Sequence, residues 1–341
     1  MNVLIFEYIT GGGLIGEVLP ASLVKEGELM LNAIARDFAE LSDVQVSVLR
    51  DYRLQSSRFD YEHVVNHESN ISTMISSMEA SIDALLIIAP ETNAVLSYLC
   101  EIYASYDFIL LNSPHRSVAL VSDKLKTFNY LQDYNIPQIA SYALDHVHDI
   151  HDGITENIDT KLIAKRVIKP KDGVACENIR VLASNDSIEN VLETKDLNNY
   201  LVQPYVHGQS ASLSLLCWQG ECLLLSVNIQ TIEEDENNFE LKQCIVNALE
   251  RDKFYEFSKN LIKALPELRG YIGVDIIITE KGVLLVEVNP RLTISYVGLK
   301  SAIGINPANL ILQTFIDEKL PQVDLISGQT VTVEVGEDRA A

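Results

Sequence analysis

Residues 270–293 read GYIGVDIIITEKGVLLVEVNPRLT, and this stretch predicts two β-strands joined by a tight turn. The predicted strands cover Tyr271–Thr279 and Val283–Asn289, and the loop between them is Glu280-Lys281-Gly282. Three-residue hairpin loops favour glycine at the position with a left-handed backbone, which Gly282 supplies. The stretch therefore predicts an antiparallel hairpin.

Two acidic side chains meet across this predicted hairpin. If Thr279 pairs with Val283, Asp275 lies directly opposite Glu287, and Asn289 follows on the same face. Opposed carboxylates repel each other unless a cation lies between them or one of them holds a proton. Two carboxylates and an amide oxygen suit Mg²⁺, with water and substrate phosphates as its other ligands. The alternative is a half-solvated strand whose acids point to water. The opposite face is apolar and predicted to be buried; it comprises Ile272, Val274, Ile276, Ile278, Leu284, Val286 and Val288.

This pattern is similar to that of a known family. Asp275 followed by Glu287-x-Asn289-Pro290-Arg291 resembles the metal-binding hairpin of the ATP-grasp superfamily. The resemblance implies that Asp275, Glu287 and Asn289 hold one or two Mg²⁺ ions on the phosphates of ATP; Mn²⁺ is the alternative metal. It also implies that Arg291 stabilises an acyl phosphate and the oxyanion formed from it.

Two lysines match the phosphate-binding lysines of the same superfamily. Lys124 lies in SDKLKTF near the start of a predicted helix, and Lys169 ends a predicted strand in RVIKPKDG. The resemblance implies that both contact the ATP phosphates, that Lys169 assists catalysis, and that the loop containing Gly173 closes over them. No G-x-x-x-x-G-K-[ST] sequence occurs, so a P-loop is not expected.

The sequence YLVQPYVHG, residues 200–208, resembles the adenine-binding hinge of ATP-grasp proteins. The resemblance implies that backbone groups of Pro204 and Val206, with Tyr205 between them, read the base. Gln203 stands where many relatives carry Glu. An amide can still accept a hydrogen bond from the adenine amine.

The composition of the chain argues against some classes of binding partner. The 341-residue chain has a formal net charge of −22, so neither nucleic acid nor an anionic membrane is expected to bind it. The alternative explanation of this charge is solubility alone. The sequence begins without a secretory signal pattern, and its strongest apolar run, Ala84–Ala89, is too short to span a bilayer. Five scattered cysteines without C-x-x-C predict reduced thiols in a cytoplasmic protein.

The order of predicted elements gives three units. Strands and helices alternate over residues 1–114, which predicts an α/β front domain with a parallel sheet, the pre-ATP-grasp domain. An α+β region follows, and the resemblance to ATP-grasp proteins implies that it is an ATP-grasp fold of two subdomains, a small lid subdomain over residues 115–206 and a large subdomain with the metal hairpin over residues 207–341. The predicted strands outside the hairpin are Val3–Ile9, Val44–Leu49, Ala84–Ala89, Phe108–Asn112, Lys161–Lys169, Tyr200–Val206, Ala211–Trp218, Glu221–Thr231 and Thr330–Val335. The predicted helices include Lys25–Leu41, Ala94–Tyr106, Ser187–Thr194, Asp252–Leu265 and Pro307–Ile316.

Further motifs point to one branch of the superfamily. FEYITGGG, EGELML, APETN, SDKLKT, KPKDG, LSVNIQ and VEVNPRLTISYVGL together resemble the branch that contains the tyramine–L-glutamate ligases of methanofuran biosynthesis. The resemblance implies ATP-dependent joining of a small-molecule carboxylate, the γ-carboxyl of L-glutamate, to an amine, either tyramine or tyrosine. The reaction would pass through an acyl phosphate and release ADP and phosphate. A homodimer is the expected assembly.

The glycines after the first predicted strand also fit G-x-G-x-x-G, as Gly11, Gly13 and Gly16. A dinucleotide site needs a helix that opens at these glycines. Helical periodicity resumes only around Lys25, so a nicotinamide or flavin enzyme is not expected. We expect instead a substrate-side loop that includes Glu7, Thr10, Gly11 and Gly12; the alternative is a turn needed for packing. Asn228, Gln230 and Ser295 are further candidate substrate residues, and ordinary polarity of the sheet surface is the alternative for the first two.

Two other functions compete with this interpretation. A different amino-acid ligase would use the same acyl-phosphate chemistry. An ATP-binding regulatory protein would lack ligase activity, but such a protein has no need of Arg291. A transition-metal site at His146, His148 and His151 is not expected, because these residues lie in a polar loop.

Overall fold

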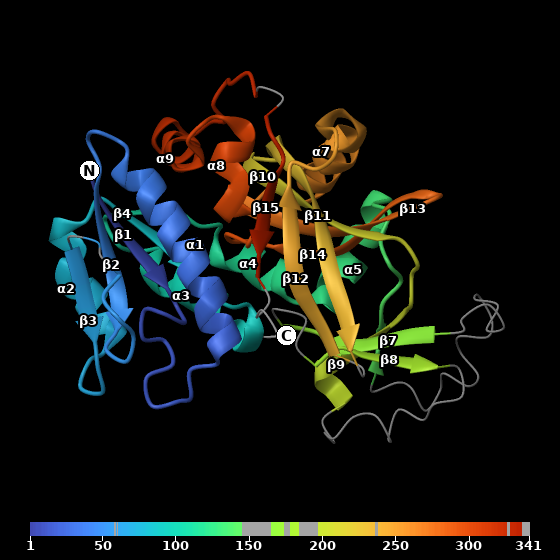
Figure 1. The fold of residues 1–341 in the computed structure, drawn as a ribbon, viewed down its shortest axis with the longest axis horizontal. Coiled ribbons are helices and arrows are strands. Elements are labelled where there is room, and N and C mark those ends of the chain that lie inside the picture. Colours follow the sequence, from blue (N-terminus) through green and yellow to red (C-terminus); the bar gives the residue numbers. More distant parts are fainter. Residues whose placement is uncertain are drawn as a thin grey trace, which may run out of the picture.

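The computed structural model describes residues 1–57, 59, 61–144, 165–173, 178–183, 197–235, 238–325 and 328–335. His146, His148, His151, Cys176 and the predicted helix Ser187–Thr194 lie outside the described residues. Figure 1 shows an α/β unit at the left, a large sheet with its helices in the centre, and a small sheet at the lower right. The division at residues 114 and 206 stays a prediction.

The N-terminal unit contains a parallel sheet of five strands in the order β3-β2-β1-β4-β5. These strands are β1 (Asn2–Glu7), β2 (Gln45–Asp51), β3 (Tyr61–Val65), β4 (Ala84–Ile88) and β5 (Ile109–Leu110). Its helices are α1 (Ala21–Ala39), α2 (Ile71–Met78) and α3 (Val95–Tyr103). The first strand is central and fully buried beyond Asn2, as expected for a parallel sheet covered on both faces. Strand β3 and helix α2 were not predicted, because YEHVV lacks a clean apolar alternation.

A six-stranded sheet forms the centre of the molecule, in the order β14-β13-β10-β11-β12-β15. Its strands are β10 (Gln209–Trp218), β11 (Glu221–Asp235), β12 (Asn238–Val246), β13 (Gly270–Thr279), β14 (Gly282–Asn289) and β15 (Val331–Glu334). The helices around it are α4 (His115–Ser122), α5 (Lys124–Leu131), α7 (Tyr255–Ala264), α8 (Tyr296–Ile303) and α9 (Pro307–Asp317). A separate four-stranded sheet, in the order β6-β9-β7-β8, comprises β6 (Tyr142–Ala143), β7 (Lys165–Pro170), β8 (Arg180–Ala183) and β9 (Tyr200–Pro204).

Helix α1 joins the N-terminal sheet to the large sheet. Its buried residues Leu31 and Ile34 belong to a single hydrophobic cluster with Ile5 of β1, Leu216 of β10 and Leu299 of α8. A second cluster covers the other face of the N-terminal sheet, and a third fills the other face of the large sheet beneath α7. One hydrophobic core therefore spans both units and fixes the N-terminal sheet relative to the large sheet.

The β13–β14 hairpin differs in detail from the predicted one. Thr279 pairs with Gly282 rather than with Val283, so the turn has two residues. A β-bulge between Asp275 and Ile276 then shifts the register by one, because such a bulge inserts an extra residue into one strand. The two differences cancel, and Asp275 pairs with Glu287 as predicted.

The same bulge changes which residues face the core on β14. Leu285 is buried in the hydrophobic cluster, whereas the predicted core residues Leu284 and Val286 are only partly buried. The prediction that Leu284 and Val286 lie in the core is therefore wrong, because the strand does not alternate without interruption.

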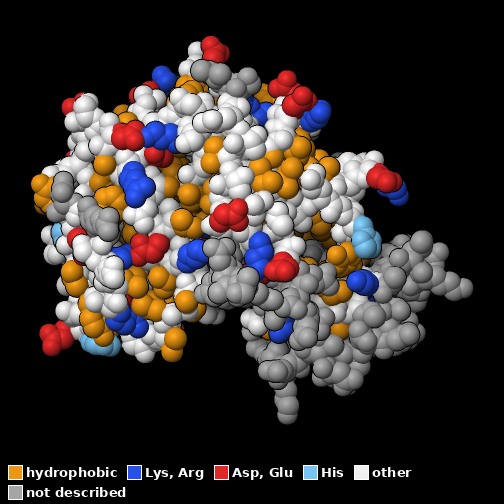
Figure 2. Space-filling model, in the orientation of Figure 1, with side chains coloured by type: hydrophobic (Ala, Val, Ile, Leu, Met, Phe, Trp, Pro, Cys, Tyr) orange, Lys and Arg blue, Asp and Glu red, His pale blue; other side chains and the backbone are white. Residues whose placement is uncertain are grey.

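Within the described residues, every helix is too short or too polar to cross a lipid bilayer. On the face shown in Figure 2, basic and acidic side chains lie interspersed among apolar ones. The residues coloured there form no continuous basic surface on this face. The expected cytoplasmic location, the homodimer and the exclusion of nucleic acid stay predictions.

Candidate active site

A cavity of about 340 Å³ lies between the small sheet, the large sheet and helix α1. Its lining combines the hinge, both predicted lysines, the hairpin acids and residues of α1 and the β11–β12 hairpin. From the sequence-predicted site it contains Lys124, Lys169, Gly173, Gln203, Pro204, Tyr205, Val206, Gln230, Asp275, Glu287, Asn289 and Arg291. Residues more than 160 positions apart are thus brought to one place.

Asp275 and Glu287 form the centre of the polar part of the cavity. The side-chain amides of Gln230 and Asn289 donate to the two oxygens of Asp275, at 2.9 and 3.0 Å. Burial, followed by the nearby charge of Glu287, raises the pKa of Asp275 to about 7. Burial alone would raise the pKa of Glu287, but Lys124 and Lys169 lower it to about 2. One acid is therefore ionised beside the lysines, and the other resists ionisation while no further cation is near.

This arrangement fits a hard divalent cation. Asn289 turns its amide nitrogen towards Asp275, which leaves its carbonyl oxygen as a ligand beside the two carboxylates. Within the described part of the chain, no three His, Cys, Asp or Glu side chains gather into a complete metal site. A cation held here would take its remaining ligands from water and substrate, which is typical of Mg²⁺.

The two lysines lie against the same carboxylate. Asp123 caps α5 by accepting hydrogen bonds from the backbone N–H groups of Leu125 and Lys126, which places Lys124 in the first turn of that helix. The Nζ atom of Lys124 lies 3.2 Å from Oε2 of Glu287 and donates to the carbonyl of Gly173 at 3.1 Å. Burial favours the neutral amine, but Glu287 raises the pKa of Lys124 above its ordinary value. Lys169 is also buried and acts on Glu287. Both lysines are therefore positioned as cations.

Arg291 has a partner that the sequence did not reveal. Its Nε and Nη2 atoms both donate to Oε2 of Glu91, at 3.1 and 2.9 Å, and Nη1 donates to the Leu292 carbonyl at 3.0 Å. Glu91 belongs to the N-terminal unit and is only 4% exposed. Three of the five guanidinium donors are thus committed within the described residues, and one N–H on each terminal nitrogen remains. The APETN motif contains Glu91, but no sequence pattern indicated that it pairs with residue 291.

Comparison with known proteins identifies the family. A model of the ATP-grasp domain matches residues 121–295, more than half of the chain, and a model of the pre ATP-grasp 3 domain matches residues 44–118. The chain belongs to the ATP-grasp family. The predicted family and fold class are confirmed.

Relatives of this ATP-grasp protein cover nearly its whole length. The tyramine–L-glutamate ligase of Methanocaldococcus jannaschii is 24% identical over 93% of this chain and 90% of its own length. The corresponding ligase of Methanocaldococcus fervens is 25% identical over 93% of this chain and 95% of its own length. An ATP-grasp superfamily protein from Archaeoglobus fulgidus has a similar crystal structure, with a TM-score of 0.71 and 23% identity over 98% of this chain and 92% of that one. The predicted branch and the enzyme class, an ATP-dependent ligase, are confirmed.

Not every predicted substrate residue reaches the ATP-grasp cavity. Gln230 lines it, whereas Asn228 is fully buried and donates to the hydroxyls of Ser212 and Ser214 at 3.2 Å. Ser295 is 1% exposed and joins the same buried network through Ser214. These contacts hold β10, β11 and the segment after β14 together. A substrate role for Asn228 and Ser295 stays a prediction that the lining of the cavity does not support.

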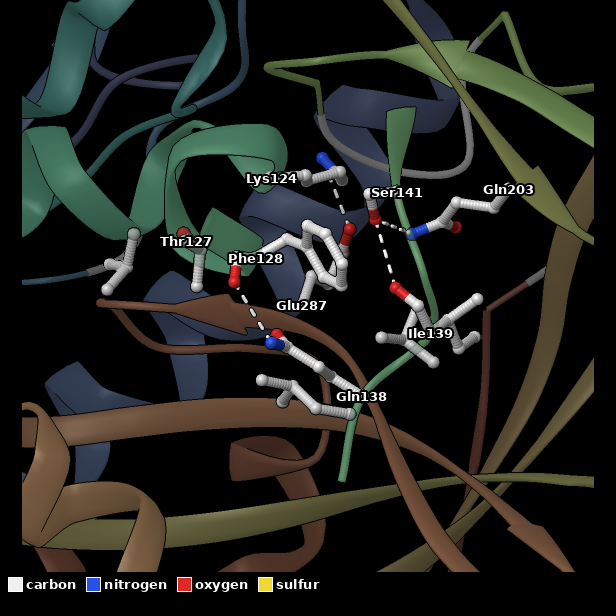
Figure 3. A pocket seen from close by; sticks show the side chains of 11 residues that line it. Lys124, Thr127, Phe128, Gln138, Ile139, Ser141, Gln203 and Glu287 are labelled. Carbon is white, nitrogen blue, oxygen red and sulfur yellow. Dashed lines mark hydrogen bonds and ion pairs between the residues drawn. The ribbon is translucent and has the colours of Figure 1, made fainter. Parts of the chain in front are cut away.

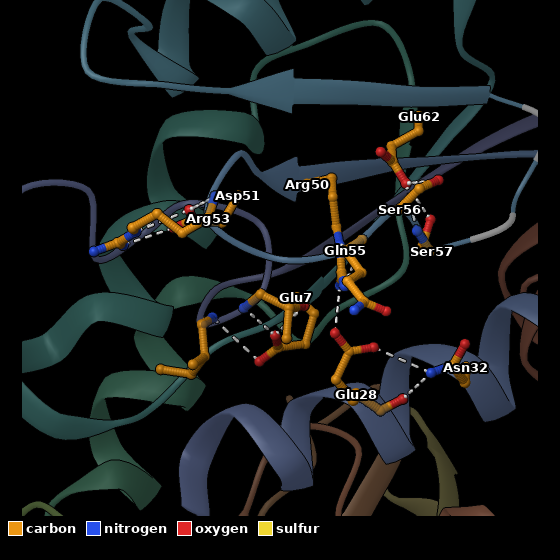
Figure 4. Close-up of polar contacts among 12 residues, drawn as sticks. Glu7, Glu28, Asn32, Arg50, Asp51, Arg53, Gln55, Ser56, Ser57 and Glu62 are labelled. Atoms are coloured by element: carbon orange, nitrogen blue, oxygen red, sulfur yellow. Dashed lines mark hydrogen bonds and ion pairs between the residues drawn. The ribbon is translucent and has the colours of Figure 1, made fainter. Parts of the chain in front are cut away.

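The N-terminal loop of this ATP-grasp chain has its own structural role (Figure 4). The carboxylate of Glu7 accepts hydrogen bonds from the backbone N–H and the hydroxyl of Thr10, both at 2.6 Å. Gly12 has φ +92°, in the left-handed region that favours glycine, and a Cβ on Gly11 would lie 2.5 Å from the Glu7 carbonyl oxygen. None of Glu7, Thr10, Gly11 and Gly12 lines the cavity described above. The geometry supports the packing interpretation of this loop over the substrate-side one.

Proposed function

We propose that this protein is an ATP- and Mg²⁺-dependent ligase that joins the γ-carboxyl of L-glutamate to tyramine or tyrosine, with release of ADP and phosphate. One observation carries the proposal: Lys124, Lys169, the Asp275–Glu287 pair and Arg291 meet at one cavity. The family of the chain and its near full-length similarity to two tyramine–L-glutamate ligases support it.

In this proposal the hairpin and the lysines bind the nucleotide phosphates. Asp275, Glu287 and Asn289 would hold Mg²⁺, or Mn²⁺ in its place, and a bound metal would supply charge neutralisation of the phosphates. Lys124 and Lys169 would add positive charge to that neutralisation, and Gly173 would belong to the loop over the phosphates. The hinge from Gln203 to Val206 would bind adenine.

The reaction requires two substitutions. An oxygen of the substrate carboxylate attacks the γ-phosphorus of ATP, the bond from that phosphorus to the ADP oxygen breaks, and an acyl phosphate forms. The amine nitrogen then attacks the acyl carbon, the bond to the phosphate oxygen breaks, and the nitrogen loses a proton. In this proposal the two remaining N–H groups of Arg291 would stabilise the negative oxygen of this second step, as oxyanion donors do.

Release of ADP tests the proposal directly. Purified protein with Mg-ATP and L-glutamate should release ADP faster when tyramine or tyrosine is added, and mass spectrometry should detect the amide product. ADP release with another acid and amine pair would indicate a different amino-acid ligase. ATP binding without ADP release for any pair would support a regulatory protein.

A further inference from the structure

A chain of hydrogen bonds runs behind the hinge (Figure 3). The Gln203 amide nitrogen donates to the Ser141 hydroxyl oxygen at 2.7 Å, and this hydroxyl donates to the Ile139 carbonyl at 3.0 Å. Ser141 and Gln203 are 4% and 5% exposed. Both contacts are therefore shielded from competing water.

These contacts define the orientation of the Gln203 amide. A serine hydroxyl has one proton to donate, and in this chain Ser141 donates it to the Ile139 carbonyl. The Ser141 oxygen can then only accept, so the amide nitrogen rather than the amide oxygen must face it. The Gln203 carbonyl oxygen Oε1 is turned away from Ser141, and within the described residues it has no hydrogen-bond partner.

The acceptor of the Ser141 proton is itself held in place. The backbone N–H of Ile139 donates to the Leu285 carbonyl at 3.2 Å, and that of Leu285 donates to the Pro137 carbonyl at 2.9 Å. The segment that precedes Ser141 is thus paired with Leu285 of β14, and Leu285 lies two residues before Glu287. Because this backbone is fixed, Ser141 cannot easily exchange the Ile139 carbonyl for another acceptor.

We propose that Ser141 is a positioning residue that sets the nucleotide specificity of the site by fixing the amide of Gln203. This inference rests on the proposed function, in which the base lies at the hinge. Adenine presents an amino group, which donates, where guanine presents a carbonyl oxygen, which accepts. Gln203 lines the cavity and its Oε1 atom is an acceptor, so in this proposal it pairs with adenine and repels guanine. If the amide were free to rotate, its NH₂ group would serve guanine equally well.

Replacing Ser141 by alanine tests whether its hydroxyl fixes the amide of Gln203. In Ser141→Ala the amide loses the partner that fixes it, so the preference for ATP over GTP should fall by about 10- to 100-fold, the value of one oriented hydrogen bond. Ser258→Ala is the matched control, because Ser258 is fully buried and donates to the Phe254 carbonyl at 2.9 Å. It lies on α7 and should leave the preference unchanged. Ser141→Thr keeps a hydroxyl and should retain most of the preference.

A second pair of variants separates orientation from general damage. A carboxylate only accepts hydrogen bonds, so Gln203→Glu presents an acceptor to the base whichever way it rotates. In that background Ser141→Ala should no longer change the ATP to GTP ratio. A purely structural role for Ser141 predicts the same loss of binding for both nucleotides in both backgrounds.

Calorimetric titration with the β,γ-imido analogues of ATP and GTP, in the presence of Mg²⁺, measures the two dissociation constants without turnover. Circular dichroism melting of each variant checks that it is folded. The inference is overturned if Ser141→Ala keeps the wild-type ratio within about threefold, or if Ser258→Ala lowers the ratio as much. ATP-selective binding without ligase activity would contradict the proposed reaction. The role of Ser141 would still be decided by the ratio of the two dissociation constants. A wild-type protein that binds neither analogue overturns both.

Discussion

Glu7 and the Asp275–Glu287 pair are acids that lie on β-strands, yet their surroundings differ. Glu7 receives hydrogen bonds from Thr10 and Ile9 of its own loop. Asp275 and Glu287 face each other across two strands, and lysines from two other elements converge on Glu287. A carboxylate satisfied by its own loop stabilises the fold, whereas opposed carboxylates remain ready for a cation.

Burial raises the pKa of an acid in both regions, so burial alone does not distinguish the Glu7 loop from the Asp275–Glu287 pair. Desolvation is the main cause that raises the pKa of Glu7 and also that of Asp275. The difference lies in the second cause, which for Asp275 is the charge of another acid. A like charge at contact distance is costly in a folded protein unless a ligand offsets it. This feature separates the candidate metal site from the structural acid.

The largest effect is expected at the opposed pair. Glu287→Gln keeps the shape of the side chain but removes a proposed metal ligand and the charged partner of Lys124, so kcat should fall by about 10³-fold or more. Coupled-enzyme measurement of ADP release gives this value. Glu280→Gln, an exposed acid in the turn of the same hairpin, is the control and should retain activity. Turnover within tenfold of wild type would show that Glu287 is not a metal ligand.

Glu7 should affect stability rather than turnover. Glu7→Ala leaves the N–H groups of Ile9 and Thr10 and the Thr10 hydroxyl without their acceptor, which should lower the free energy of unfolding by about 3 kcal/mol. The kcat per folded molecule should stay within twofold of wild type. Urea denaturation and ADP release measure the two quantities. A loss of turnover without a loss of stability would restore the prediction that this loop contacts the substrate.

Glu91 is intermediate between the Glu7 loop and the opposed pair, because only one of its oxygens has a partner. Arg291 donates to Oε2, whereas Oε1 is buried without a hydrogen-bond partner within the described residues. Glu91→Gln should weaken the hold on Arg291 and lower kcat by about 10-fold with little change in KM for ATP. Asp37→Asn is the matched control, since Asp37 on α1 also links the N-terminal unit to another part of the chain, through Tyr296 and Lys300 of α8. If kcat falls by the same factor in both variants, the role of Glu91 is only to join the two units.

The smallest effect concerns pH. The pKa of Glu7 is raised in the folded protein, so between its ordinary value and the raised one only the folded state keeps the proton. The contribution of Glu7 to stability is therefore complete below about pH 4.5 and is lost as the pH rises through the folded pKa, by about 1.4 kcal/mol for each unit of the shift. Urea denaturation of wild type and Glu7→Gln at pH 5 and 7.5 should show a stability difference that changes in this direction. An unchanged difference would mean that Glu7 titrates normally.

The candidate site residues of the hairpin were predictable from the sequence because their signals are local. Turn chemistry and alternation brought Asp275 and Glu287 together, even though the assumed turn and the missed bulge were both in error. The Glu91–Arg291 and Ser141–Gln203 contacts left no such signal. Their partners are 200 and 62 positions apart, and no periodicity relates residues at those distances.

The sequence by itself indicated the family and gave the hairpin acids, both lysines and the hinge as candidate site residues, since each depends on a short pattern of residues along one or two strands. Only the tertiary structure decided that Glu7 accepts hydrogen bonds from its own loop, that Leu285 rather than Leu284 enters the core, and that Glu91 pairs with Arg291. Those outcomes depend on which separate segments pack together. Packing is set by the shape and burial of the whole core, which no single stretch of sequence contains.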